Sequence, residues 1–235
     1  MALATGPDRL RYEVKLQGQP ADAAGSFFIE ISGDCIPPPV DRHDFVVLAL
    51  LFLAMRSGRD LYVQGRLSRQ LLANLEEFQR AWAAWRPYWY RPVRIHCDEE
   101  VAAVAPALQG QAVLAYSGGV DSNFALVDQL ENPGRDARRL VTGVLIQGFD
   151  IPLDATEGFA AALADARAST TAMGLPLTVL RTDMRSAFSV QWTDEFGAAL
   201  AACLSVFAAI AGTGLLAADH DYRHLVFPWG SNAIT

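Results

Sequence analysis

The sequence contains a single lysine, Lys15, and only three cysteines, Cys35, Cys97 and Cys203, among its 235 residues. Because every other strong cation is an arginine, a phosphate site within this chain depends on arginine side chains and backbone N–H groups. The cysteines are odd in number and form no CxxC pair, which argues against a disulfide framework and a four-cysteine zinc site. We expect them to be buried, small apolar side chains.

An excess of positive charge and a secretory signal are also missing. The formal net charge is −7, which argues against a general nucleic-acid surface. Residues 1–14 contain no apolar core long enough for a signal peptide, so we expect a cytoplasmic protein. The apolar run at residues 45–55 is too short to cross a bilayer. The run at residues 198–218 is long enough, but Gly212 and Gly214 interrupt it, which favours a buried helix followed by a buried strand.

The first part of the chain, residues 1–108, is predicted to form a small α+β domain. Two alternating segments separated by turn residues indicate a hairpin. Asp41 or Asp44 and Ser68 are candidate N-caps, and Gly58 is a candidate C-cap. We expect, in order, hairpin strands over residues 9–17 and 26–33, a helix over 45–58, a strand over 60–65, a helix over 67–85 and a strand over 92–98.

Strands and helices alternate in the second part, residues 109–235. The strands are continuous apolar runs, which are typical of a parallel sheet with helices on both faces. The sequence therefore predicts an α/β fold with a parallel sheet, preceded by the small α+β domain. Since the chain ends soon after the fourth strand, we expect either a fragment or a homo-oligomer or partner subunit that covers this edge. The expected strands are 112–116, 140–148, 176–183 and 214–219, and the expected helices are 122–131, 156–174 and 194–212.

A short polar stretch, SGGVDS, lies where the first of these strands ends and a helix begins. Gly118 and Gly119 allow a ligand to approach the main chain closely, and successive N–H groups there can form an anion site. The positive end of the following helix faces the same place. Ser117 and Ser122 add hydroxyl donors. Asp121 would repel bare phosphate, but it fits if Mg²⁺ lies between the carboxylate and the phosphate.

The stretch lacks the Gly-Lys-Ser/Thr ending of a Walker A loop and the G-x-G-x-x-G spacing of a dinucleotide site. It resembles the PP-loop of the ATP pyrophosphatase superfamily, which includes asparagine, GMP and NAD synthetases, and the resemblance covers residues 110–235. The resemblance implies that the loop holds the pyrophosphate of ATP and that cleavage falls between the α and β phosphates. The alternative is an ordinary strand-to-helix turn. The implied ATP-binding residues of the loop are Ser117, Gly118, Gly119, Val120, Asp121 and Ser122.

Further candidates lie at the ends of the next two predicted strands or just after them. The resemblance implies that backbone groups of Leu145, Ile146 and Gln147 contact adenine. Asp150 is a candidate for ribose, metal or substrate binding, or is simply solvated. Arg181 and Arg185 are candidates for neutralising phosphate and Asp183 for assisting the metal, although surface arginines are common.

Three other segments leave alternatives open. Residues 218–224 combine acids and histidines that would line the active-site mouth, bind metal or be merely exposed. Residues 228–232 would form a substrate loop or a plain turn. In residues 80–92, aromatic side chains suggest stacking on nucleobases, but Trp82 and Trp85 are spaced to lie in a core, and we favour the core.

These features predict an ATP- and Mg²⁺-dependent, AMP-forming ligase with Asp121, Ser117 and Arg185 as catalytic residues. It would adenylate a small-molecule carboxylate or amide oxygen for attack by an amine or ammonia. The alternatives are a nucleotide-binding module or sensor without turnover and, less favoured because of charge and cysteine content, a tRNA-modifying enzyme. We expect ATP and a small molecule as ligands, and neither a membrane nor nucleic acid.

Overall fold

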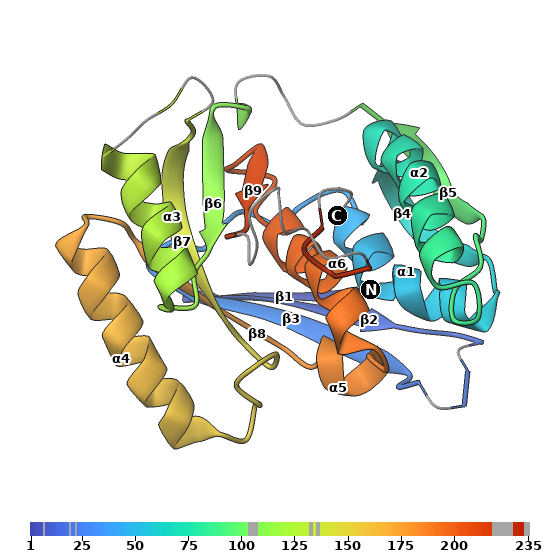
Figure 1. Ribbon diagram of the computed structural model, residues 1–235, viewed down its shortest axis with the longest axis horizontal. Coiled ribbons are helices and arrows are strands. Elements are labelled where there is room, and N and C mark those ends of the chain that lie inside the picture. Colours follow the sequence, from blue (N-terminus) through green and yellow to red (C-terminus); the bar gives the residue numbers. More distant parts are fainter. Residues whose placement is uncertain are drawn as a thin grey trace.

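The computed structural model describes residues 1–6, 8–18, 20–21, 23–102, 108–131, 134, 137–217 and 228–232. These residues form a mixed α/β structure with a seven-stranded sheet in the order β1-β2-β3-β8-β7-β6-β9 and a separate pair, β4-β5 (Figure 1). The strands are β1 (Ala2–Gly6), β2 (Arg9–Lys15), β3 (Ser26–Gly33), β4 (Leu61–Ser68), β5 (Ile95–Val101), β6 (Gln111–Ala115), β7 (Arg139–Gln147), β8 (Leu177–Thr182) and β9 (Thr213–Leu215). The helices are α1 (Asp44–Ser57), α2 (Arg69–Trp85), α3 (Val120–Glu131), α4 (Thr156–Ala172), α5 (Met184–Phe188) and α6 (Trp192–Ser205).

The large sheet is only partly parallel, which corrects the predicted parallel sheet. Strands β8, β7, β6 and β9 pair in parallel, but β1, β2 and β3 continue the same sheet with antiparallel pairing, and β3 pairs with β8. The physical reason is that pairing with β3 satisfies the backbone groups along the edge of β8, and the apolar face of the hairpin packs in the same core as α1 and α6. The predicted boundary between residues 108 and 109 is not tested by this pairing and stays a prediction.

The two faces of the sheet are packed by different elements. Along β6, Val113 and Ala115 belong to a core shared with α1, α2, α5, α6 and the hairpin, whereas Leu114 points into a second core. That second core contains Leu126 from α3 and Phe159 from α4. Figure 1 shows α3 and α4 on the opposite side of β6 and β7 from α6. The parallel part of the sheet is therefore covered on both faces, which explains its continuous apolar strands.

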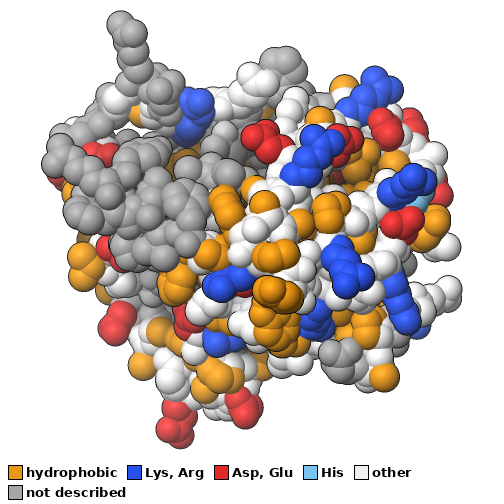
Figure 2. Space-filling model, turned by 45° about the vertical axis from the view of Figure 1, so that its right-hand side comes forward, with side chains coloured by type: hydrophobic (Ala, Val, Ile, Leu, Met, Phe, Trp, Pro, Cys, Tyr) orange, Lys and Arg blue, Asp and Glu red, His pale blue; other side chains and the backbone are white. Residues whose placement is uncertain are grey.

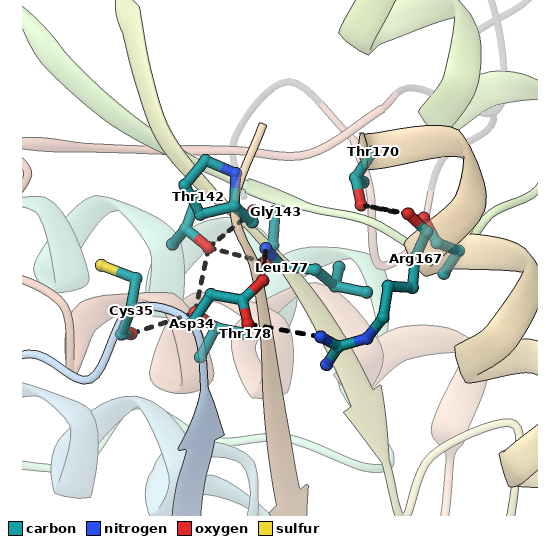
Figure 3. A network of polar contacts seen from close by, with 10 residues as sticks. Asp34, Cys35, Thr142, Gly143, Arg167, Thr170, Leu177 and Thr178 are labelled. Atoms are coloured by element: carbon teal, nitrogen blue, oxygen red, sulfur yellow. Dashed lines mark hydrogen bonds and ion pairs between the residues drawn. The ribbon is translucent and has the colours of Figure 1, made fainter. Parts of the chain in front are cut away.

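A polar network joins the antiparallel part of the sheet to the parallel part (Figure 3). Asp34, just after β3, pairs with Arg167 of α4 at 3.3 Å and accepts a hydrogen bond from the Leu177 N–H at 3.2 Å. The buried hydroxyl oxygens of Thr142 and Thr178 lie 2.9 Å apart on adjacent strands. The network fixes how β3 meets β8 at the amino end of β8.

Several local predictions are confirmed and one is wrong. The hairpin forms, Gly58 ends α1 with φ 63°, and the Ser68 side chain caps α2 by accepting from the Leu71 N–H. Neither predicted aspartate caps α1, because its N-cap is His43, and Asp44 instead accepts from the Ser68 N–H at 2.8 Å. Strand β1 and the short helix α5 are not foreseen by the sequence patterns.

The two apolar runs lie within the fold. Among the described residues, no helix combines the length and the apolar character needed to span a membrane. The described part of the run at 198–218 contains the end of α6 and then β9, which confirms the order of helix and strand. The predicted burial of the strand is wrong, because no residue of β9 is buried. Trp82 is fully buried and packs against Phe52 and Tyr90, which confirms the core interpretation for this residue. All three cysteines are free, but only Cys203 is fully buried.

Candidate functional site

The SGGVDS loop connects the carboxyl end of β6 to the amino end of α3, as the sequence predicts (Figure 1). Strand β6 lies inside the parallel part of the sheet, between β7 and β9. The carboxyl ends of parallel strands meet at one edge, where ligands bind in open α/β sheets. Residues after β6, β7 and β8 therefore share this edge.

The loop is held by hydrogen bonds to a neighbouring asparagine. The Asn123 side-chain amide donates to the Gly118 and Gly119 carbonyl oxygens at 2.8 and 3.0 Å. The Tyr116 hydroxyl donates to the Asn123 Oδ1 at 2.6 Å, and Tyr116 itself is buried. Gly118 has φ 79°, which a residue with a Cβ adopts only with strain. These contacts turn the loop carbonyls toward Asn123 and give the loop a defined shape.

The loop leaves donors without acceptors. No acceptor within the described part of the chain bonds the N–H groups of Gly118, Val120, Asp121 or Ser122. Three of these belong to the first turn of α3, whose N–H groups point out of the helix end. The Ser122 hydroxyl is buried and donates to the Gly119 carbonyl at 3.1 Å, so it shapes the loop. The loop can thus offer mainly backbone donors to an anion.

The residues fit a magnesium-bound polyphosphate in part. Asp121 is exposed in the first turn of α3, and its carboxylate has no ion pair among the residues described. Asp183, the second predicted metal residue, accepts from the Phe28 N–H at 2.9 Å and precedes α5. Across the described ranges, no group of three or more His, Cys, Asp or Glu side chains forms a metal cluster. A metal held by one carboxylate and by phosphate oxygens is compatible with this arrangement.

The side chains at the end of β7 are engaged within the protein. Leu145 and Ile146 pack in the two cores, and Gln147 is buried with its amide donating to the Pro152 carbonyl at 3.1 Å. The pairing of β7 with β6 ends at Val144. Beyond it, the side of β7 that faces the loop is not paired with β6, but Leu145 and Gln147 are both buried there, so little of this backbone is exposed.

The two candidate arginines near the end of β8 occupy different places: Arg181 lies within the strand, and Arg185 follows it in α5. Arg181 donates through Nε to the Gln147 Oε1 at 3.1 Å and lies 3.7 Å from Glu30. Arg185 donates to the Phe149 carbonyl at 2.7 Å and lies 3.4 Å from Asp150. Its guanidinium also stacks over Trp192, 4.6 Å from the ring centroid. Arg185 therefore fastens the loop after β7 to α6, and its partners occupy part of its hydrogen-bonding capacity.

A buried pair of acids begins α6 beside this region. Asp194 lies 3.4 Å from Arg86 and accepts from the Tyr90 hydroxyl at 3.3 Å. Burial raises the pKa of the Glu195 carboxyl, and the hydrogen bond that it accepts from the Gln191 N–H at 3.3 Å opposes that rise. Burial, with the nearby acids, also raises the pKa of Tyr90 far above its ordinary value.

The larger cavities lie away from the loop. One of about 530 Å³ lies between the end of β2, α1 and β4, and one of about 570 Å³ lies between α1, α2, α6 and β9. Ser231 and Asn232 of the candidate substrate loop line the second cavity, but no predicted ATP- or metal-binding residue lines either one. Arg185 borders a third cavity, of about 20 Å³. An exposed anion site at a sheet edge needs no deep cavity, so the loop remains the candidate site.

Two other segments are candidates for the active site on sequence alone. Residues 218–224 lie outside the described residues. In residues 228–232, the Gly230 N–H donates to the Thr193 carbonyl at 2.8 Å, and Trp229 packs against Phe196 with ring centroids 6.0 Å apart. This segment therefore lies against the start of α6.

Sequence reasoning missed Glu30 and Phe28 of β3, which contact Arg181 and Asp183 respectively. These contacts join residues about 150 positions apart, and no local spacing signals them. No protein-family model matches this chain, and no curated protein or solved structure matches it either.

Proposed function

We propose that this chain is a PP-loop ligase that uses ATP and Mg²⁺ and forms AMP and pyrophosphate. In this proposal, residues 109–235 are its nucleotide-binding domain, with the parallel strands as a Rossmann-like core. The observation that supports it best is the exposed diglycine loop with unpaired N–H groups at the junction of β6 and α3. The SGGVDS residues resemble those of the superfamily at the same kind of junction.

The proposed reaction has two steps. A carboxylate or amide oxygen of a small molecule attacks the α-phosphorus of ATP, the bond to the bridging oxygen breaks, and pyrophosphate leaves. An amine or ammonia then attacks the activated carbon, AMP leaves with the bonding electrons, and the nitrogen loses a proton to solvent. The chain contributes positioning and charge stabilisation, because the loop N–H groups and the Ser117 hydroxyl surround the leaving pyrophosphate.

Asp121 is the proposed Mg²⁺ ligand, and the metal would neutralise charge on the phosphates. Arg181 and Arg185 are proposed to add positive charge at the same edge of the sheet. Backbone groups of residues 145–147 are proposed to contact adenine where β7 extends beyond its pairing with β6. A cytoplasmic location and a partner at the carboxyl-terminal edge also stay predictions.

The second candidate is an adenine-nucleotide sensor without turnover. The observation that favours it concerns Arg185, the predicted catalytic arginine. Its guanidinium already contacts Phe149, Asp150 and Trp192, which leaves it fewer N–H groups for phosphate. A tRNA-modifying activity has less support. In the view of Figure 2, acidic and basic side chains are interspersed, with hydrophobic side chains between them.

Exchange of labelled pyrophosphate into ATP separates these candidates. The protein is incubated with Mg-ATP and panels of small carboxylic acids and amides. A ligase exchanges label with at least one of them, whereas a sensor binds ATP without exchange. The ligase proposal fails if ATP binds and no panel member supports exchange or AMP formation.

The Asp121→Asn variant tests the metal role. We expect it to reduce Mg²⁺-dependent exchange at least about 100-fold. The reason is that a carboxylate that holds the metal contributes several kcal/mol to stabilisation of the transition state. Circular dichroism should show an unchanged fold. Asp128→Asn, two turns later on the same helix, is the matched control and should keep full exchange. Normal turnover by Asp121→Asn would show that the metal role is wrong.

A further inference from the structure

The outer face of the antiparallel strands carries charged side chains. In β2, Leu10, Tyr12 and Val14 enter the core, so the intervening residues point to the opposite face. Within the described part of the chain, the core beneath α3 and α4 includes no residue of β1, β2 or β3. None of the described helices therefore packs on this face of the hairpin, and it is exposed to solvent. The charged residues that it presents on β2, β3 and β8 are Arg9, Arg11, Glu13, Lys15, Glu30 and Arg181.

One glutamate on this face is surrounded by three arginines, and we call the four residues the arginine cluster. Glu30 accepts from Arg11 at 3.2 Å and lies 3.5 Å from Arg9 and 3.7 Å from Arg181. The Glu30 side chain is only 11% exposed, whereas Arg9, Arg11 and Arg181 are 64%, 33% and 42% exposed. One carboxylate cannot neutralise three guanidinium groups, so the cluster has a net charge of +2.

Two of the guanidinium groups are held in place. Arg181 donates to Gln147, which is itself fixed by bonds to the loop after β7. Arg11 stacks over Phe28, with its central carbon 3.9 Å from the ring centroid. Glu13 lies opposite Phe28 on the neighbouring strand, but it makes no ion pair among the described residues. An arginine that is already oriented loses less conformational entropy when it binds an anion.

The cluster adjoins the candidate site without being part of the loop. Arg181 is next to the last residue of β8, at the same edge as the carboxyl end of β6. Two strand spacings separate β6 from β8, which corresponds to roughly 10 Å. An anion in the cluster would thus be a different group from a pyrophosphate in the loop.

We propose that the arginine cluster binds an anionic group, a carboxylate or a phosphate, of the molecule that the site activates. This proposal rests on the proposed function for the identity of the ligand, but the anion site itself does not depend on it. Guanidinium groups bind the paired oxygens of carboxylates and phosphates through parallel N–H bonds. Glu30 occupies part of that capacity and orients the three side chains, and the outward N–H groups remain for the ligand.

The test uses inorganic phosphate and, in a separate arm, citrate as probes at constant ionic strength. Binding is followed by NMR through the side-chain Nε–Hε signals of the arginines. We expect saturable shifts of Arg9, Arg11 and Arg181, and the arm that saturates at lower concentration identifies phosphate or carboxylate as the preferred group. Shifts that match those of exposed Arg94 in both arms would overturn the proposal.

We predict opposite changes in probe affinity for two variants of the cluster. Arg11→Gln should weaken probe binding about tenfold, because it removes one charged hydrogen-bond donor. Glu30→Gln should tighten binding, since it removes the competing carboxylate and raises the net charge. Arg94→Gln is the matched control and should leave binding unchanged. Equal affinities of Arg11→Gln and Arg94→Gln would reject the site, even if Glu30→Gln proves too unstable to measure.

The Asp121→Asn variant separates this proposal from the proposed function. It should lose pyrophosphate exchange and keep phosphate binding in the cluster. If wild-type protein shows the shifts but supports no exchange, the proposed function fails and the anion site stands. If exchange occurs without the shifts, the anion site fails and the proposed function stands.

Discussion

At the scale of single residues, Gly118 determines the shape of the candidate loop. Its φ of 79° lies in the left-handed region, and its carbonyl accepts from Asn123. A Cβ at this position would meet nothing closer than Ala166 at 3.9 Å. The requirement for glycine here is therefore conformational and does not come from crowding.

Replacement of Gly118 by alanine should lower the free energy of unfolding by about 1–2 kcal/mol, because a left-handed backbone is strained for L-residues. The measurement is urea unfolding followed by circular dichroism. Gly158→Ala, in the first turns of α4 with open space around it, is the control. It should be neutral or stabilise by up to about 1 kcal/mol. Equal losses in the two variants would contradict the assigned strain.

At the scale of elements, the start of α6 concentrates buried charge. Glu195 and Asp194 are both buried in its first turn, and Arg86 and Tyr90 from the preceding part of the chain contact Asp194. An unpaired carboxylate in such a place would be costly. The pairing of Asp194 with Arg86 therefore ties α6 to the end of α2.

The stability of this element should depend on pH through Glu195. Because burial raises its pKa, the folded protein binds the proton more tightly than the unfolded chain does. The contribution is thus fully present below the ordinary glutamate pKa of about 4.3 and is lost as pH rises through the raised pKa. Relative to Glu195→Gln, the wild type should lose stability from pH 4 to pH 7.

Urea unfolding at several pH values measures this difference. Glu157→Gln, at an exposed position in the first turn of α4, is the control, and its stability difference from the wild type should stay nearly constant. A difference between wild type and Glu195→Gln that does not change with pH would contradict the buried, raised-pKa carboxyl.

At the scale of the whole molecule, the sheet joins both parts of the chain. Strand β3 pairs with β8, and the core on one face includes Tyr12, Phe45, Val113, Leu180 and Phe207. The first part of the chain thus covers apolar surface of the second. Figure 1 shows β1, β2 and β3 continuing the sheet beside β8.

Separation of the chain at the predicted boundary should therefore prevent folding. We expect the fragment 109–235 alone to give no cooperative thermal transition, whereas the full chain unfolds in one. In this fragment, the sheet face that the first part of the chain covers would be exposed to solvent, and Asp194 would lose its partners Arg86 and Tyr90. Mixing with fragment 1–108 should restore the transition. A dispersed NMR spectrum and a cooperative transition of fragment 109–235 alone would show that it is an independent domain.

Local patterns were sufficient for most of the elements. The alternation in residues 9–15 and 26–33 predicts the hairpin, Ser68 and Gly58 mark helix ends, and SGGVDS marks the junction of β6 and α3. These features depend on neighbours in the chain, so the sequence reveals them. Strand β1 is short and α5 has five residues, and such elements give weak periodic signals.

The amino-acid sequence by itself determined the order of the strands and helices other than β1 and α5, the position of the glycine loop and the burial of Trp82. Only the tertiary structure decided that the hairpin joins the parallel strands in one sheet, that Asp183 bonds Phe28, and that Arg181 meets Glu30. The reason is physical: periodicity and capping act within a few residues, whereas sheet pairing and ion pairs depend on which distant surfaces must cover each other.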